Sequence, residues 1–169
     1  AEVIATDIDE SSVDLLYLKA KEKGLKILPL LLPFDDLEKK IYGVSYDEKE
    51  YEGRDFKNIP LFLPATERLK SDMVMCLGLL HHLMLGRGKD IDLVFKILSK
   101  LTEKMLILEF VSLSDNLIQG EPSFFKNINN YSEHNYNIDI IRNAGLKYFK
   151  SVKVMDSDPE TRKLLVFKK

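Results

Sequence analysis

The sequence predicts an α/β fold with a mostly parallel sheet, and two features support this prediction. The first is the run DMVMCLG at residues 72–78, which is apolar nearly throughout, as in a buried parallel strand covered on both faces. The second is the order that follows, in which a helical pattern at residues 91–101 precedes another apolar run, MLILEFV, at residues 105–111. Strands that alternate with helices are typical of a parallel sheet with helices on both faces.

The chain begins with a strand, a helix and a second strand. Residues 3–6 are rich in β-branched side chains and predict the first strand. We expect a helix that starts at Ser11, with Asp14 as its capping-box partner, and that stops at Gly24. The run LKILPLLL at residues 25–32 predicts the second strand. Its proline favours an edge position or a bulge, because proline cannot donate a hydrogen bond to a neighbouring strand.

The segment at residues 33–63 lacks a regular pattern. It contains prolines, glycines and charge clusters such as DEKEYEGRD, and so long an irregular stretch in a compact domain is usually functional. We therefore expect a single domain over residues 1–169, with residues 33–63 as a variable or substrate-side insert. A short helix with proline in its first turn is predicted at residues 64–70.

The second half of the chain is predicted to hold two longer helices. A helical turn is expected at residues 79–85, and Asp90 caps the amphipathic helix that follows. Residues 112–130 are polar and rich in asparagine, and they predict mostly loop. Ser132 is expected to cap a last helix that ends at Gly145.

Two strands are predicted at the end of the chain, at residues 147–155 and 163–168. The turn sequence DSDP separates them, which is typical of an antiparallel hairpin. The sheet would thus be mostly parallel and would end in a C-terminal antiparallel hairpin.

The composition is that of a soluble globular protein. Of 169 residues, 45% are hydrophobic and 31% are charged, and 25 Lys and Arg against 27 Asp and Glu leave a formal charge of −2. This balance gives no electrostatic reason to expect a nucleic-acid partner. Cys76 is the single cysteine, so no disulfide can form within the chain, and a cytoplasmic location is expected. No apolar run reaches the roughly 18 residues of a membrane span, so no membrane partner is expected.

Several segments together resemble the class I S-adenosylmethionine-dependent methyltransferases. VIATDID resembles the second strand of that family, whose terminal acid holds the cofactor ribose. SDMVMCLGLLHHL resembles the fourth strand with its common L-H-H-L ending, MLILEFV resembles the fifth, and the final hairpin resembles the sixth and seventh. The resemblance implies a Rossmann-like sheet and methyl transfer from S-adenosyl-L-methionine.

A closer resemblance is to the nodulation-protein-like branch of these methyltransferases. It rests on the segments ILPLLLPFDDL, TERLKSDMVMCLGLLHHL and LILEFVSLSD. In that branch the motif of the fifth strand usually reads E-F-V-P-x-x-D-P. Here Ser112 and Asn116 replace the two prolines, whereas Glu109 and Asp115 remain.

The resemblance also implies a strand that the 169 residues do not contain. The family sheet has the order 3-2-1-4-5-7-6, and its first strand leads into a glycine-rich cofactor loop with the motif E/D-x-G-x-G-x-G. Neither is found here, and the sequence begins without Met at AEVIATDID. We expect the domain to be N-terminally incomplete, with its first strand absent from this chain, because strands 2 and 4 would otherwise lack their shared neighbour.

Six residues are the candidates for the cofactor site that the resemblance implies. Asp7 could accept hydrogen bonds from the ribose hydroxyls, or it could be an acid that the dipole of the following helix favours. Ile8 would lie against the adenine. Asp35 and Asp36 either receive the adenine amino group or form a solvated pair in a loop. The backbone of Leu77 and Gly78 would line the methionine end of the cofactor.

His81, His82 and Glu109 are the candidate catalytic residues. Adjacent residues on a helical turn point about 100° apart, so one of the two histidines would face the cofactor, as a positioning group or a general base. The alternatives are a packing role for the histidines and a structural ion pair for Glu109. No metal site is expected, because three histidines and one cysteine lack ligand spacing. Nearby aromatic residues either roof the pocket or belong to the core: Phe124, Phe125, Tyr131 and Tyr136.

The leading hypothesis is methyl transfer to a small-molecule or glycan-type acceptor. Two other classes remain open: an NAD-type oxidoreductase, which also needs a ribose-binding acid, and a non-catalytic partner protein that kept the fold. The terminal hairpin argues against the oxidoreductase.

Overall fold

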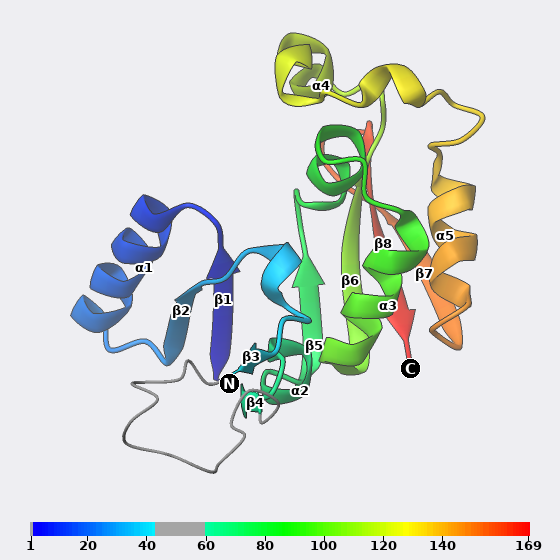
Figure 1. Cartoon of the computed structure of the whole chain (residues 1–169). Coiled ribbons are helices and arrows are strands. Elements are labelled where there is room, and N and C mark those ends of the chain that lie inside the picture. The colour runs from blue at the N-terminus through cyan, green and yellow to red at the C-terminus, as the bar shows by residue number, and fades with distance from the viewer. Residues whose placement is uncertain (1, 43–59) are drawn as a thin grey trace, which may run out of the picture. The chain divides into compact units, whose positions relative to one another are not determined.

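The computed structural model describes residues 2–42 and 60–169, and these form two compact units divided between Leu69 and Lys70 (Figure 1). Each unit is an α/β arrangement, and each is described by itself.

The first unit begins with two parallel strands and the helix that connects them. Strand β1 (Val3–Asp7) pairs with β2 (Ile27–Leu31), in register from Val3 opposite Ile27 to Asp7 opposite Leu31. Pro29 lies in β2 of this two-stranded sheet, which agrees with the expected edge position. The parallel pairing brings the carboxyl ends of both strands to the same end of the sheet.

Helix α1 (Glu10–Glu22) does not start where the sequence predicts. Its N-cap is Asp9, whose carboxylate accepts hydrogen bonds from the backbone N–H groups of Ser11 and Ser12, each over 3.2 Å. Asp9 reaches these N–H groups first, so Ser11 lies inside the helix and Asp14 is not part of a capping box. The helix ends at Glu22, followed by Gly24 at φ +61°.

The rest of the first unit is built from short elements. A 3₁₀ turn (Phe34–Asp36) follows β2, β3 (Ile41–Tyr42) pairs antiparallel with β4 (Pro60–Phe62), and α2 (Ala65–Arg68) confirms the predicted short helix. The expected insert at 33–63 therefore contains a small strand pair, while its residues 43–59 lie outside the described part of the chain.

The second unit contains a four-stranded mixed sheet with the order β5-β6-β8-β7. Strands β5 (Ser71–Cys76) and β6 (Thr102–Val111) are parallel. Strand β8 (Arg162–Lys168) is antiparallel to β6 on one side and to β7 (Ser151–Asp156) on the other. The predicted C-terminal antiparallel hairpin is thus confirmed, and its last strand lies between β6 and β7.

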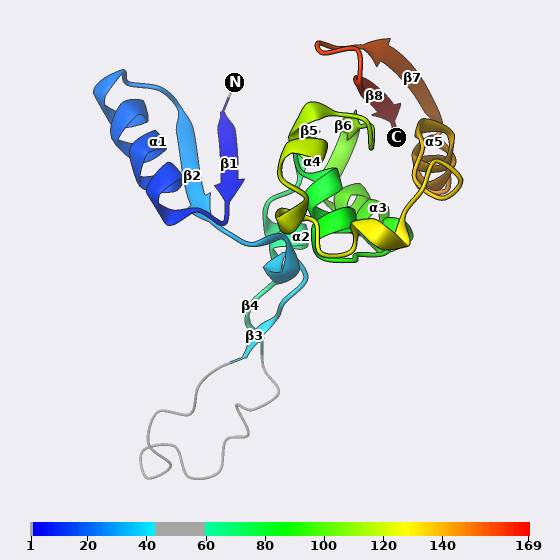
Figure 2. The same cartoon turned by 90° about the horizontal axis from the view of Figure 1, so that it is seen from above.

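Two helices cover one face of this sheet. Helix α3 (Ile91–Leu101) begins after the predicted cap Asp90, which accepts a hydrogen bond from the Leu93 N–H over 3.1 Å. Helix α5 (Ile138–Leu146) is capped by Asn137 and not by Ser132, which instead forms a turn with Asn135. Figure 2 shows both helices on the same side of the strands.

The expected cover on both faces is not seen in the described residues of this unit. The crossover from β5 to β6 and the crossover from β6 to β7 progress toward the same edge of the sheet, so right-handed connections put α3 and α5 on one face. On β5, Met73 and Met75 are 46% and 59% exposed, which corrects the prediction of a strand buried on both faces.

The core of the second unit lies between the helices and the sheet. It includes Phe95 of α3 and Phe167 of β8, whose ring centroids are 5.2 Å apart. Gly145 of α5 packs directly on this pair, since a methyl group there would overlap the ring of Phe167 and come within 2.8 Å of Phe95 Cε1. The other fully buried side chains include Leu106, Leu108, Ile141 and Leu165.

Four short helical segments complete the second unit near the carboxyl ends of β5 and β6. A π-helical turn (His82–Gly86) follows β5, and α4 (Asn116–Gly120) with two 3₁₀ turns (Pro122–Phe124 and Ile128–Asn130) follows β6. The sequence predicts mostly loop after β6, so α4 was missed. Across the described residues, no helix combines the length and apolarity required to cross a bilayer.

Candidate functional site

The turn after β5 is joined to a side chain of the neighbouring strand by a hydrogen bond. After Cys76 and Leu77 the chain bends at Gly78, whose φ of +63° lies in the left-handed region that favours glycine. The Gly78 N–H donates to Glu109 Oε2 over 2.8 Å. This bond fixes the backbone at the carboxyl end of β5, where the sequence predicts the methionine end of a cofactor.

Glu109 belongs to a charged cluster that connects β6, β8 and the start of α4. Arg162 Nη1 lies 3.9 Å from Glu109 Oε1, and Arg162 Nε donates to Asp115 Oδ2 over 3.0 Å. Asp115 is 1% exposed, and it also accepts from Thr161 Oγ1 over 2.6 Å and from the Leu117 N–H over 3.0 Å. Glu109 thus forms the ion pair that was the alternative to a catalytic role.

The charge of Asp115 is stabilised by its hydrogen bonds. The bond from Arg162 is the main cause that lowers the pKa of Asp115 to about 2, and the bonds from Thr161 and the Leu117 N–H act in the same direction. Asp115 is therefore ionised at neutral pH and neutralises Arg162 inside the fold.

The adjacent His81 and His82 have different surroundings. His81 is 4% exposed, and neither of its ring nitrogens has a hydrogen-bond partner among the described residues. Burial, followed by the charges of His82 and Arg162, lowers the pKa of His81 to about 4. His82 is exposed, and partial burial and the charge of Arg87 lower its pKa as well. Both imidazoles are therefore mainly uncharged at neutral pH.

A small cavity lies beside the exposed histidine. The ring of His82 stacks on Phe125, with ring centroids 5.3 Å apart, and the ring of His81 lies 4.2 Å from that of His82. The cavity has a volume of about 140 Å³, and we call it the His82 cavity. Its lining residues are His82, Leu117, Glu121, Phe124 and Phe125.

The aromatic residues that the sequence singled out thus divide between the cavity and the core. Phe124 and Phe125 line the His82 cavity, but Phe124 is 65% exposed whereas Phe125 is 1% exposed and also belongs to the core. Tyr136 is fully buried, and its hydroxyl donates to the Val111 carbonyl over 3.0 Å. The segment that follows β6 supplies most of the residues that line the cavity. The periodicity of the sequence does not predict that this segment lies beside His82.

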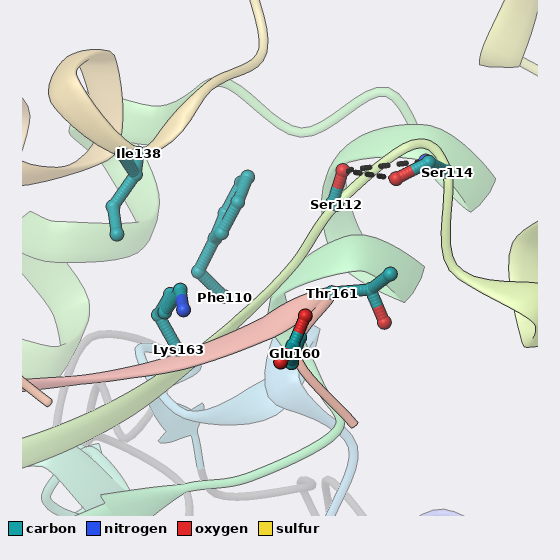
Figure 3. Close-up of a pocket in the computed structure, with 7 residues that line it drawn as sticks. All are labelled: Phe110, Ser112, Ser114, Ile138, Glu160, Thr161 and Lys163. Atoms are coloured by element: carbon teal, nitrogen blue, oxygen red, sulfur yellow. Dashed lines mark hydrogen bonds between the residues drawn. The ribbon is translucent and has the colours of Figure 1, made fainter. Parts of the chain in front are cut away.

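A second, more open cavity of about 410 Å³ lies beside the hairpin β7–β8 (Figure 3). The hydroxyl groups of Ser112 and Ser114 lie 3.0 Å apart on one side, and Phe110 and Ile138 lie on the other. Lys163, which also lines it, forms an ion pair with Asp156 over 2.9 Å. No sequence pattern pointed to this cavity, since its residues come from separate elements.

Asp7 lies at the carboxyl end of β1, as predicted for a ribose-binding acid. Its Oδ1 accepts hydrogen bonds from the Ile8 N–H over 2.7 Å and from the Asp9 N–H over 3.0 Å. Within the described part of the chain, Oδ2 has no hydrogen-bond partner. The carboxylate is therefore held by its own turn and presents one oxygen as an acceptor, while Ile8 is 54% exposed.

Asp35 and Asp36 lie in the 3₁₀ turn that follows β2, at the same end of the parallel pair as Asp7. Asp36 forms an ion pair with Lys39. Phe34 and Leu37 are buried beside them and anchor the turn.

The structure thus groups the predicted residues by unit. Gly78, His81, His82 and Glu109 lie around the carboxyl ends of β5 and β6, and the acids of the first unit lie at the carboxyl end of β1 and β2. Cys76 is buried beside this region, and burial, followed by the charge of Glu109, raises the pKa of its thiol to about 12. In the described ranges, no group of three or more His, Cys, Asp or Glu side chains could hold a metal ion.

Comparisons with known proteins identify a likeness of fold. No protein-family model matches the sequence, and no curated protein matches it. A solved structure described as a possible exported protein from Bordetella parapertussis is similar to 99% of this chain, with a TM-score of 0.56 and 12% sequence identity. The match covers 53% of that protein, so the chain spans about half its length. At this identity the likeness concerns the fold alone.

Proposed function

We propose that this chain is part of an S-adenosylmethionine-dependent methyltransferase domain that acts on a small-molecule or glycan-type acceptor. The strand order of the second unit is the observation that carries the proposal. In β5-β6-β8-β7 the last strand is antiparallel and lies between its two predecessors. This is the order 4-5-7-6 that the family resemblance implies, and an ordinary dinucleotide-binding sheet does not have it.

The first unit supports the same proposal. Its parallel pair β2–β1 agrees with strands 3 and 2 of the family, and Asp7 lies at the end of the strand that resembles the second. The glycine-rich loop of the family is not found in the 169 residues, so the proposal places that part of the cofactor site outside them.

The residues present fit part of the cofactor site. Asp7 Oδ2 is an available acceptor for a ribose hydroxyl, and the exposed side chain of Ile8 offers apolar contact. A bound S-adenosylmethionine would supply an activated methyl group on a sulfonium. The chain itself would contribute binding and alignment, which dominate a displacement of this kind.

The test is a thermal shift of the full-length natural protein with S-adenosylhomocysteine. A ligand at about 100 times its dissociation constant stabilises the folded state by about 2.7 kcal/mol, so the melting temperature should rise by several degrees. Asp7→Ala should remove most of this rise. Asp14→Ala, which removes an exposed carboxylate of α1, should leave it unchanged.

Two results would contradict the proposal. One is an unchanged melting temperature at millimolar S-adenosylhomocysteine. The other is an equal or larger shift with NAD, which would favour an oxidoreductase.

A further inference from the structure

The His82 cavity combines an aromatic lining with hydrogen-bonding groups that the described residues do not use. Phe124 and the imidazole of His82 are exposed rings of the lining, Phe125 is 1% exposed and stacks on His82, and Leu117 supplies an aliphatic side chain. No hydrogen bond to the His82 ring is found within the described ranges, and both nitrogens of the buried His81 behind it lack a partner there as well.

The size of the cavity limits what can enter it. Its volume is about 140 Å³. An enclosed apolar cavity of about 150 Å³ is known to hold one benzene molecule, so a single six-membered aromatic ring is the largest group that the walls of this more open cavity would surround. A larger fused ring system would have to extend outward from it.

The lining residues also indicate which substituents a bound aromatic ring would carry. Aromatic rings prefer stacked or edge-to-face contact with other rings, which the 65% exposed ring of Phe124 can provide. His82 is mainly uncharged at neutral pH, so one of its ring nitrogens can accept a hydrogen bond from a hydroxyl group. Glu121, the carboxylate of the lining, disfavours an aromatic acid.

We propose that the His82 cavity binds the ring of a phenol-type small molecule, whose hydroxyl group donates a hydrogen bond to His82. The cavity lies beside the carboxyl end of β5. If the proposed function holds, on which this part of the inference rests, the phenol is the methyl acceptor: its oxygen would take the methyl group that the sulfonium supplies, the methyl–sulfur bond would break to leave a thioether, and His82 would take the phenol proton. The binding itself needs only residues of the second unit.

The experiment is a titration of the full-length protein with phenol, cyclohexanol and toluene, followed by the NMR signals of the His82 and Phe125 rings. Phenol should bind at least about five times more tightly than cyclohexanol, which lacks the aromatic ring, and than toluene, which lacks the hydroxyl group. His82→Phe keeps a ring but removes the acceptor. It should weaken phenol binding about fivefold and leave toluene binding unchanged.

Two further variants test the location. Leu117 is 51% exposed and lines the cavity, whereas Leu146 is 39% exposed and does not. Leu117→Trp should fill the cavity and abolish phenol binding, and the matched Leu146→Trp should bind phenol like the natural protein. Circular dichroism of both variants checks that they fold.

Each contrary result overturns the inference. Equal affinity for phenol and cyclohexanol would exclude ring recognition, and unchanged binding in His82→Phe would exclude the hydrogen bond. Unchanged binding in Leu117→Trp would exclude this cavity, and no phenol binding at millimolar concentration would exclude the ligand. If S-adenosylhomocysteine raises the melting temperature but phenol does not bind, the proposed function stands and the phenol site is excluded. If phenol binds but S-adenosylhomocysteine causes no shift, the phenol site stands and the proposed function is excluded.

Discussion

The replacement of Asp115 by asparagine should destabilise the second unit in a pH-dependent way. Asp115 is 1% exposed and holds Arg162, Thr161 and the backbone of Leu117. The pKa of its carboxyl is lowered from 3.8 to about 2, mainly by the hydrogen bond from Arg162. At 1.36 kcal/mol per pKa unit, this corresponds to roughly 2 kcal/mol of folding free energy at neutral pH.

The sign of the pH dependence follows from the lowered pKa. The stabilisation is fully present above the pKa of the unfolded state and is lost as the pH falls through that of the folded state. The difference between the natural protein and Asp115→Asn should therefore be constant from pH 7 to about pH 5 and should shrink toward about pH 2.

Urea unfolding read by hydrogen exchange of β6 and β8 measures this difference within the second unit. Asp156→Asn is the control, because that carboxylate also pairs with a cation but is 94% exposed, so its loss should change stability little. Two results would refute the reasoning. One is that Asp115→Asn lowers the free energy of unfolding by less than about 1 kcal/mol at pH 7, and the other is that this decrease stays the same down to about pH 2.5.

Two other predictions follow from the packing of the second unit. Gly145→Ala should lower the free energy of unfolding by about 1–3 kcal/mol in urea titrations, because its methyl group would overlap Phe167, whereas Gly120→Ala, with nothing within 4 Å, should not. If the first variant is as stable as the natural protein, α5 does not approach β8 as closely as described. Cys76, which is 3% exposed with its pKa raised to about 12, should react with iodoacetamide at pH 8 at least about 100 times more slowly in the folded protein than in urea. Similar rates in both states would contradict its burial.

The elements with strong periodic patterns were predictable from the sequence. The helix after Asp90 has apolar residues on one face and a cap that the structure confirms. The strand at 105–111 and the final hairpin were likewise predicted to within a few residues. In these segments the local pattern and the tertiary packing agree, because the apolar face of each element is the one that the core buries.

Helix starts were less predictable because several residues nearby could cap them. Asp9 and Ser11 both have suitable side chains, and the backbone at Asp9, extended at φ −89° and ψ 107°, decides between them. In the same way Asn137 caps α5 while Ser132 joins a turn five residues earlier. Capping depends on the direction of the entering chain, which a single sequence does not reveal.

The candidate site was predictable only in part. His81 and His82 stand out because they come soon after an apolar strand, and Glu109 stands out as an acid within one. The neighbours of His82 come from the polar segment after β6, where Phe125 and Glu121 occur without a repeating pattern. Contacts between segments so far apart in sequence depend on the sheet register, which periodicity does not determine.

The position of β5 has a practical consequence for anyone who purifies these 169 residues alone. In the described part of the chain, β5 is an edge strand, and Met73 and Met75 project from it with about half of their surface exposed. Exposed apolar edges recruit strands from other molecules. Dilute solutions would slow self-association, and a buffer free of peroxides would protect both thioethers from conversion to sulfoxide.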